Sequence, residues 1–153
     1  MFNPLKLIPS SVYTKQDKAN TKFASAALRV PTGAYILNAG LGKFEAKGEA
    51  AEGLRDLGAT GIPAIKEFDA ETFAKALATA ETALGAGLLC PFIPNRLAGL
   101  GLTAFGAGLL TMYFGNPDMT ESDGIRPSDA GKSMAKDAWL VGTGLALAAL
   151  PRK

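Results

Sequence analysis

The sequence predicts an all-α fold, an integral membrane bundle of four transmembrane helices. Three observations support this fold class. Four apolar segments alternate with hydrophilic connections, and a helix needs about 20 residues to cross a bilayer. The third segment, residues 97–115, carries no charged residue and shows no polar face recurring every 3.6 residues. Glycine is frequent in the apolar segments, where small residues let helices approach closely in lipid.

The first predicted transmembrane helix covers residues 23–42. They are apolar apart from Arg29 and Asn38. Pro31 is acceptable there because neighbouring groups can satisfy the freed carbonyl. Residues 1–22 are expected to be a polar cytoplasmic tail, since they lack the apolar stretch of a removable signal peptide.

The connection after the first helix is charged and contains a short amphipathic segment. Within residues 45–66, Ala51, Leu54 and Leu57 share one helical face, and Gly61 marks its end. We expect this helix to lie over the outer end of the bundle. It would serve equally well as a docking surface for an external partner.

The second and third predicted helices cover residues 74–93 and 97–115. Lys75 and Glu81 are the ionisable residues of the second helix. A short link containing Arg96 joins the two helices.

The fourth predicted helix covers residues 134–150, and residues 151–153 form a C-terminal tail. It spans a bilayer only if Lys136 and Asp137 lie at the interface. Trp139 is expected to anchor it there. Asp137 is expected to cap the helix, or alternatively to join an external polar site.

Small residues spaced four apart predict where the helices touch. One pair is Ala83 and Gly87, and a longer series is Ala138, Gly142 and Ala146. The competing fold is a soluble four-helix bundle. It is disfavoured because each interior glycine costs up to about 1 kcal/mol in a soluble helix.

Charge suggests that both termini are cytoplasmic. The tails and the link hold seven Lys/Arg and one acidic residue, and the connections 43–73 and 116–137 hold seven and twelve. The positive-inside rule counts only Lys and Arg, so the two sides tie in number. The basic residues are denser in the shorter cytoplasmic segments, which favours this orientation.

Four polar residues could form an intramembrane cluster: Arg29, Asn38, Lys43 and Glu81. A charge at the bilayer centre costs about 2.5–3.5 kcal/mol, so it normally faces a partner or a cavity. At 1.5 Å per residue, Lys43 is the easier partner for Glu81, and Arg29 could reach it only if the helices shift. These residues either fix helix register or surround a small ligand such as a quinone head group.

The composition excludes several classes of function. Histidine is absent and Cys90 is the single cysteine, so no metal site or catalytic residue is predicted and the chain has no cofactor of its own. No basic patch interleaved with aromatic residues indicates nucleic-acid binding.

Four stretches resemble the DoxX family of small membrane proteins. They are LRVPTGAYILNAGLGKF, AAEGLRDLGATGIPA, ATAETALGAGLLCPFIPNRLAGLGLTAFGAGLL and KDAWLVGTGLALAAL. The resemblance covers residues 23–150 and implies a four-helix membrane domain. It also implies association with membrane oxidoreductase assemblies, and it places Arg29, Lys43 and Glu81 at the family's charged positions.

The expected function is that of an accessory subunit, not catalytic by itself. It would anchor or organise a redox or respiratory complex in a prokaryotic plasma membrane, with a link to oxidative-stress defence. Its expected partners are the lipid bilayer and the other subunits of that complex. The alternatives are a quinone-interacting subunit of a membrane oxidoreductase and, more weakly, a small transporter.

Overall fold

The chain is all-helical through residues 15–151, which the computed structural model describes. This confirms the predicted all-α class. Within these residues the β-structure is limited to one isolated bridge between Thr120 and Pro127. The elements are α1 (Lys15–Lys43), α2 (Glu49–Gly61), η3 (Pro63–Glu67), α3 (Ala70–Leu89), α4 (Asn95–Gly115), η4 (Pro117–Met119), α5 (Lys132–Ala135) and α6 (Ala138–Ala149).

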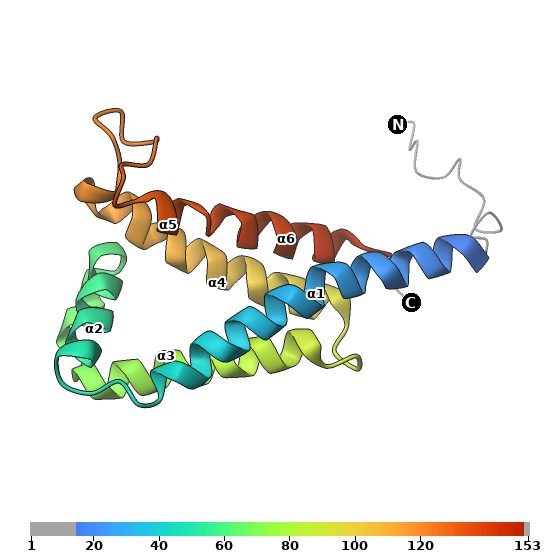
Figure 1. The fold of residues 1–153 in the computed structure, drawn as a ribbon, viewed down its shortest axis with the longest axis horizontal. Coiled ribbons are helices and arrows are strands. Elements are labelled where there is room, and N and C mark those ends of the chain that lie inside the picture. Colours follow the sequence, from blue (N-terminus) through green and yellow to red (C-terminus); the bar gives the residue numbers. More distant parts are fainter. Residues whose placement is uncertain (1–14, 152–153) are drawn as a thin grey trace, which may run out of the picture.

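The long helices pack in two pairs. Helix α1 lies along α3, and α4 lies along α6, whereas far less contact joins one pair to the other. The pairs meet in a small core and diverge toward the end where α2 crosses (Figure 1). That core contains Ile36, Leu88, Ala98, Leu102 and Leu147.

The helices begin and end within a few residues of their predicted bounds, with one large exception. Helix α1 begins at Lys15, eight residues before the predicted start at Phe23, so the end of the predicted tail is helical. Helix α1 continues through Pro31. Asp69 starts α3, because its carboxylate accepts a hydrogen bond from the Thr72 amide at 2.9 Å.

One helix in the described range, α4, is both long enough and apolar enough to cross a membrane. Its 21 residues correspond to about 32 Å of helix. Helix α6 has only 12 residues and is separated from α5 by a turn at Lys136 and Asp137. One described helix therefore meets the criterion that the predicted four-span bundle requires of four.

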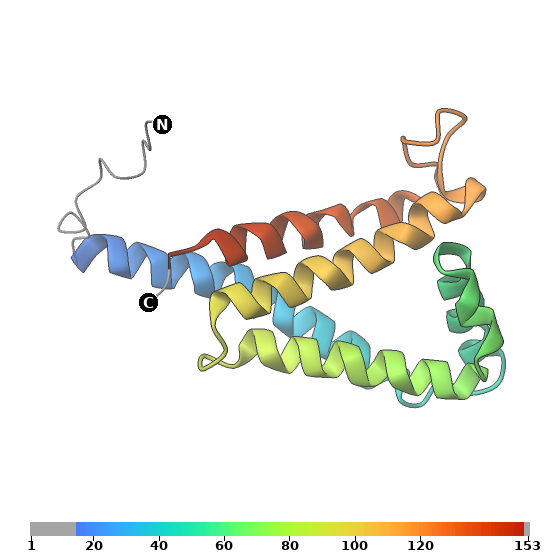
Figure 2. The same ribbon diagram turned by 180° about the vertical axis from the view of Figure 1, so that it is seen from behind.

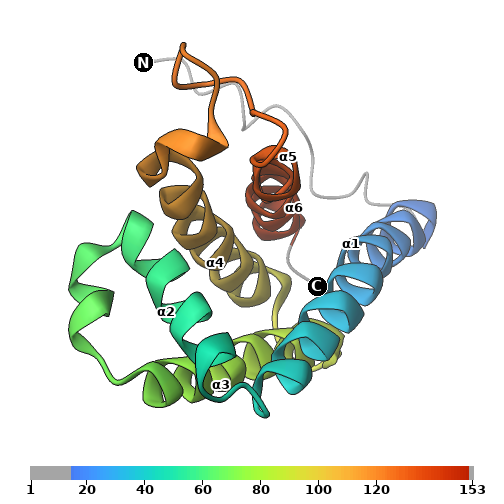
Figure 3. The same ribbon diagram turned by 60° about the vertical axis from the view of Figure 1, so that its left-hand side comes forward.

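The predicted amphipathic helix between the first two long helices is present as α2. Ala51 is fully buried and contacts Ala70 and Ala74 of α3. At its other end α2 meets α4, where the Thr60 hydroxyl donates to the Met112 carbonyl at 3.4 Å. Figure 3 shows α2 lying between α3 and α4, so it spans the open side of the two pairs as expected.

The two ends of the molecule differ in structure. The α3–α4 link, residues 90–94, lies at one end together with the last turn of α6, and we name this the link end (Figure 2). Helix α2 and the loop of residues 116–131 lie at the other, which we name the cap end (Figure 1). The two long connections therefore lie at one end of the helices and the short link lies at the other.

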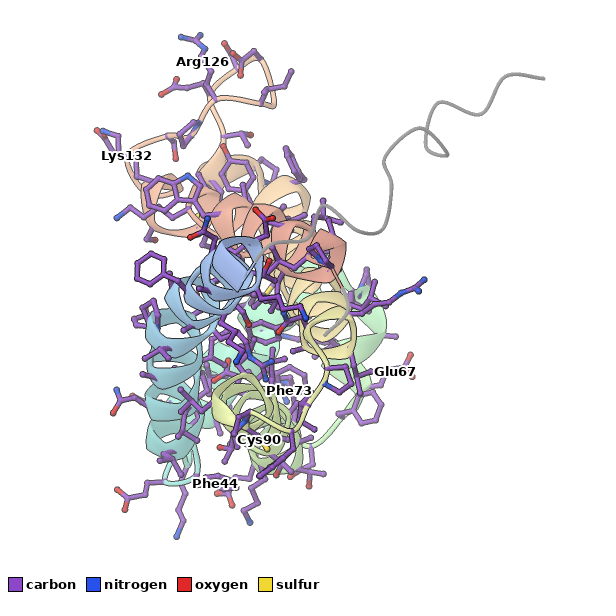
Figure 4. The ribbon with its side chains drawn as sticks, turned by 90° about the vertical axis from the view of Figure 1, so that its right-hand side faces the viewer. Phe44, Glu67, Phe73, Cys90, Arg126 and Lys132 are labelled. Atoms are coloured by element: carbon purple, nitrogen blue, oxygen red, sulfur yellow. The ribbon has the colours of Figure 1, made fainter. Side chains whose placement is uncertain are left out.

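The loop at the cap end is an ordered hairpin. Glu121 and Ser128 donate their amides to Arg126 and Met119 carbonyls at 2.7 and 3.0 Å. Gly124 occupies the turn with a φ of 68°, a conformation that favours glycine. Arg126 projects from the far end of the loop (Figure 4).

Asp123 makes the loop sensitive to acid. Its carboxylate accepts hydrogen bonds from the Arg126 side chain and from the amides of Ile125 and Arg126. Arg126 is the largest cause, and together these donors lower the pKa of Asp123 to about 2. Because the pKa of Asp123 is lowered in the folded state, its ionised carboxylate stabilises the loop fully above about pH 4. This stabilisation is lost as the pH falls through 2.

We therefore expect amide exchange in residues 119–128 to accelerate between pH 4 and pH 2, after correction for the intrinsic pH dependence of exchange. Asp123→Asn should accelerate it already at pH 7. The control is Asp118→Asn, since the Asp118 side chain is exposed and accepts no hydrogen bond in the described structure. Equal protection in Asp123→Asn and the native chain would contradict this role.

Two predictions about contacts are wrong. Asp137 precedes α6 but makes no side-chain capping hydrogen bond, because it adopts helical dihedrals inside a turn that continues from α5. The Ala83–Gly87 pair and the series Ala138, Gly142 and Ala146 do not form the helix contacts: Gly87 and Gly142 have no neighbour within 4 Å of an added Cβ, and the three alanines are exposed.

Other glycines make the close approaches. An added Cβ at Gly85 would lie 2.7 Å from the Cα of Leu37, and one at Gly40 would lie 2.6 Å from the Thr82 amide. Between α4 and α6, Gly99 and Gly144 face each other. Each helix pair therefore packs backbone against backbone. Small residues make these contacts, as predicted, but they are not the small residues that the spacing indicated.

Candidate functional site

The guanidinium of Arg29 is the most heavily bonded group in the described structure. It lies on α1, is only 5% exposed, and reaches the C-terminus of α3. Its Nε donates to the Leu88 carbonyl at 2.7 Å, and its Nη2 donates to the carbonyls of Gly87 and Cys90 at 2.9 and 2.6 Å. These carbonyls belong to the last turn, where a helix lacks internal donors.

The remaining nitrogen, Nη1, extends the network into the α3–α4 link. It donates to the Ile93 carbonyl at 2.8 Å and to Asn95 Oδ1 at 2.9 Å. The Ser25 hydroxyl donates to the same Asn95 oxygen at 2.7 Å. A guanidinium has five N–H donors, and all five are used, so Arg29 fixes the link to α1 and has no donor left for a ligand.

Lys43 and Glu81 form a second polar contact near the opposite end of the α1–α3 pair. The Lys43 Nζ lies 2.7 Å from Glu81 Oε2 and also donates to the Ala39 carbonyl at 3.3 Å. The Glu81 side chain is 6% exposed and that of Lys43 is 25% exposed. This is the pair that the helix rise predicted, and an ionised partner with a further hydrogen bond is what a buried carboxylate requires.

The four predicted site residues do not come together. Arg29 and Lys43 are 14 positions apart on α1, which corresponds to about 21 Å along the axis. Asn38 is exposed and, within the described residues, makes no hydrogen bond to Glu81. The predicted single polar cluster is therefore absent from the described structure. Two separate contacts between α1 and α3 take its place, one toward each end of this helix pair.

A hydroxyl beside Glu81 lacks a partner. The Thr82 Oγ1 is buried and forms no hydrogen bond with any residue that the structure describes. It faces Gly40, where an added Cβ would lie 2.7 Å away. The close approach of the two backbones holds this hydroxyl between them and leaves no space for a ligand there.

Sequence reasoning missed a large groove at the link end. It encloses about 1010 Å³ and is lined by residues 91–97, by Leu100, and by Leu145 with residues 148–151. Arg96 is the one ionisable residue in this lining. The apolar character of the lining could have been predicted from the sequence, but its concave shape depends on how the link folds against α6.

The described residues contain no group of three or more Cys, Asp and Glu side chains placed to hold a metal ion. A scan against protein-family models, a search of curated proteins and a search of solved structures each give no match to this chain. The similarity to the DoxX family thus stays a prediction from the four sequence stretches.

Proposed function

We propose that this chain is an integral membrane subunit in which α1, α3, α4 and the α5–α6 segment cross the bilayer. One observation carries the proposal: many large apolar side chains of the long helices are exposed on the outside of the structure. The exposed ones are Phe23, Val30, Tyr35, Leu41, Leu89, Leu97, Leu100, Phe114, Trp139 and Leu145. Soluble proteins rarely expose apolar surface of that extent, whereas lipid covers it at no cost.

The buried polar groups support the same placement. Among the described residues, the buried polar or charged side chains are Ser25, Arg29 and Glu81. Each is bonded to another part of the chain. Ionisable residues within a membrane are tolerated when they face the protein interior and are paired, and these residues meet that condition.

The α5–α6 segment can cross with its charged residues at the boundary. Beyond these charged residues, α6 has 12 residues, which correspond to about 18 Å of helix. This is less than the hydrocarbon thickness of about 30 Å, and local thinning of the bilayer accommodates such a short segment. Trp139 is 73% exposed near the cap end, which suits an aromatic interface anchor.

An accessory role follows from how the polar groups are used. Arg29 is saturated by its own chain, and Lys43 pairs with Glu81, so neither is free for chemistry. The cap end offers α2, η3 and the hairpin loop as an ordered surface outside the bilayer. We propose that this surface organises partner subunits, and the redox nature of the complex rests on the similarity to DoxX proteins.

Topology is the direct test of the membrane proposal. Cys90 is the single cysteine and lies in the link. In sealed cells, a membrane-impermeant maleimide should leave Cys90 unlabelled until the membrane is permeabilised. In Cys90→Ser with Ser122→Cys, the loop cysteine should be labelled at once. Equal labelling of both positions in sealed cells would show that no membrane lies between them and would overturn the proposal.

The organising role is tested by purification in mild detergent followed by mass spectrometry. Stable association with oxidoreductase subunits is expected. Association should weaken in Ile62→Glu, which changes an exposed residue of the cap end, and should persist in Lys18→Gln, which changes an exposed residue in the first turn of α1. Recovery of the chain alone from its native membrane would contradict the organising role.

The second candidate is a quinone-interacting subunit, and the specific observation that favours it is the partly exposed Lys43 ammonium beside the buried Glu81 carboxylate. A head group would have to compete with this ion pair. Substitution of both residues separates a structural role from binding.

Lys43→Met should lower stability by about 3–5 kcal/mol, because it leaves Glu81 buried without a counter-charge. The double variant Lys43→Met/Glu81→Met should recover most of the loss, since an apolar pair can replace a buried ion pair. Thermal unfolding in detergent measures both. A double variant that is stable but no longer retains quinone would favour the binding role, and one no more stable than Lys43→Met would contradict the pairing.

A further inference from the structure

The groove at the link end combines an apolar surface with one unpaired cation. Its walls include Phe92, which is 90% exposed, and Leu97, Leu100 and Leu145, which are between 52% and 62% exposed. Arg96 lines the same groove. In the described structure this guanidinium has no acidic partner and no hydrogen bond, unlike Arg29, which donates to the link beside it.

The charge around the groove has one sign. Among the described residues, no acidic side chain lines it, and Arg96 carries the one charge of the lining. The acidic residues of the described long connections belong instead to the cap end. An occupant that fits this groove therefore carries a negative group near Arg96 and an apolar body along the helices.

We propose that the groove holds an anionic phospholipid, with its phosphate at Arg96 and an acyl chain along Leu97, Leu100 and Leu145. The volume of about 1010 Å³ lies at the upper limit of ordinary ligand sites, which suits a lipid. The proposal rests on the membrane placement described above. In that placement the link end faces the cytoplasmic leaflet, which carries the anionic lipids.

Arginine is suited to this recognition because its planar fork donates two parallel hydrogen bonds to a phosphate. A zwitterionic lipid offers the same phosphate together with a positive group, which the groove has no acid to pair. Selectivity for a net negative head group over phosphatidylcholine follows from that difference.

The test uses the full chain, purified in mild detergent and stripped of lipid. Phosphatidylglycerol and phosphatidylcholine with identical acyl chains are added separately, and bound lipid is counted by native mass spectrometry. The native chain should retain one phosphatidylglycerol at a concentration about tenfold lower than for phosphatidylcholine, since the repulsion between the choline cation and Arg96 costs about a factor of ten.

Three variants locate the site. Arg96→Gln should remove the selectivity and leave both lipids equally weak, and it should not affect folding because Arg96 is exposed and unpaired. Ala149→Trp fills the groove at an exposed position and should reduce retention of both lipids. Lys47→Gln removes an exposed cation at the cap end and should leave the selectivity unchanged.

Several results would overturn the proposal. They are equal retention of the two lipids by the native chain, undiminished selectivity in Arg96→Gln, a quinone extracted from the site in place of phospholipid, and a dimer that Ala149→Trp converts to a monomer. If maleimide labelling shows a membrane-spanning chain and lipid selectivity is absent, only the groove proposal fails. If labelling places no membrane between the link and the loop, both fail.

Discussion

Replacing Arg29 with methionine is expected to destabilise the folded chain by about 3–5 kcal/mol, because it leaves buried carbonyls of α3 and the link without a donor. For a chain of this size, that lowers the unfolding temperature by roughly 10 °C. Thermal unfolding in detergent, followed by circular dichroism, is the measurement. The unfolding temperature of Arg29→Lys should lie between those of the native chain and Arg29→Met, since an ammonium has three donors in place of five.

The control for this prediction is Arg126→Met. Arg126 is also an arginine with a hydrogen-bonded partner, but it lies on the exposed hairpin loop, so its loss should leave the main transition unchanged. Asn95→Ala removes one acceptor of Arg29 and the partner of Ser25, and should cost less than Arg29→Met. An Arg29→Met chain that melts with the native one would show that the α3 carbonyls find other donors.

A single methyl group at Gly85 is expected to force α1 and α3 apart. The Cβ of Gly85→Ala would lie 2.7 Å from the Cα of Leu37 and closer still to the Leu37 amide. Both atoms are backbone, so no side-chain rotation relieves the contact. Overpacking of this kind costs about 1–3 kcal/mol and occasionally more, and we expect the upper end of that range.

Gly87→Ala provides the matched control, two positions along the same helix. Nothing lies within 4 Å of an added Cβ at Gly87, so the only change is the gain in helix propensity. That gain is up to about 1 kcal/mol in favour of alanine. The two substitutions should therefore shift the unfolding temperature in opposite directions. A shift of the same sign and size would mean that α1 and α3 do not meet backbone to backbone.

The sequence was informative wherever hydrophobic pattern decides the outcome. The all-α class, the long helices and the short helix at the cap end all follow from apolar segments and their glycine and proline boundaries. The start of α1 at Lys15 could not be predicted in this way, because residues 15–22 are polar and a helix that projects beyond its packing partner leaves no apolar pattern.

The two polar contacts differ in how far they could be predicted. The Lys43–Glu81 pair could be predicted because it requires only that the two residues lie at similar heights along their helices, and the rise per residue gives those heights. The role of Arg29 depends on where the last turn of α3 ends and how the link turns, and carbonyl groups leave no trace in the sequence. The sequence therefore offered Glu81 as a partner of Arg29 only if the helices shift, whereas its hydrogen bonds go to four backbone carbonyls and to Asn95 Oδ1.

The glycine contacts show the same limit. Spacing of four residues marks small residues on a common face, but it does not tell which face meets a neighbour. Gly33 and Gly40 are seven positions apart on α1 and both approach α3, whereas Gly87 and Gly142 face away. Choosing among such series requires the positions of both helices.

The pairing of α1 with α3 and of α4 with α6 has a consequence for biosynthesis, because each long helix pairs with a neighbour in chain order. Every acceptor of Arg29 lies between Gly87 and Asn95, so the α1–α3 hairpin is complete as soon as Asn95 has been made. The close contacts of α4 with α6 involve only residues made later. In the proposed membrane placement, the chain would therefore enter the bilayer as two successive finished hairpins, and α2 would then join the first to the second.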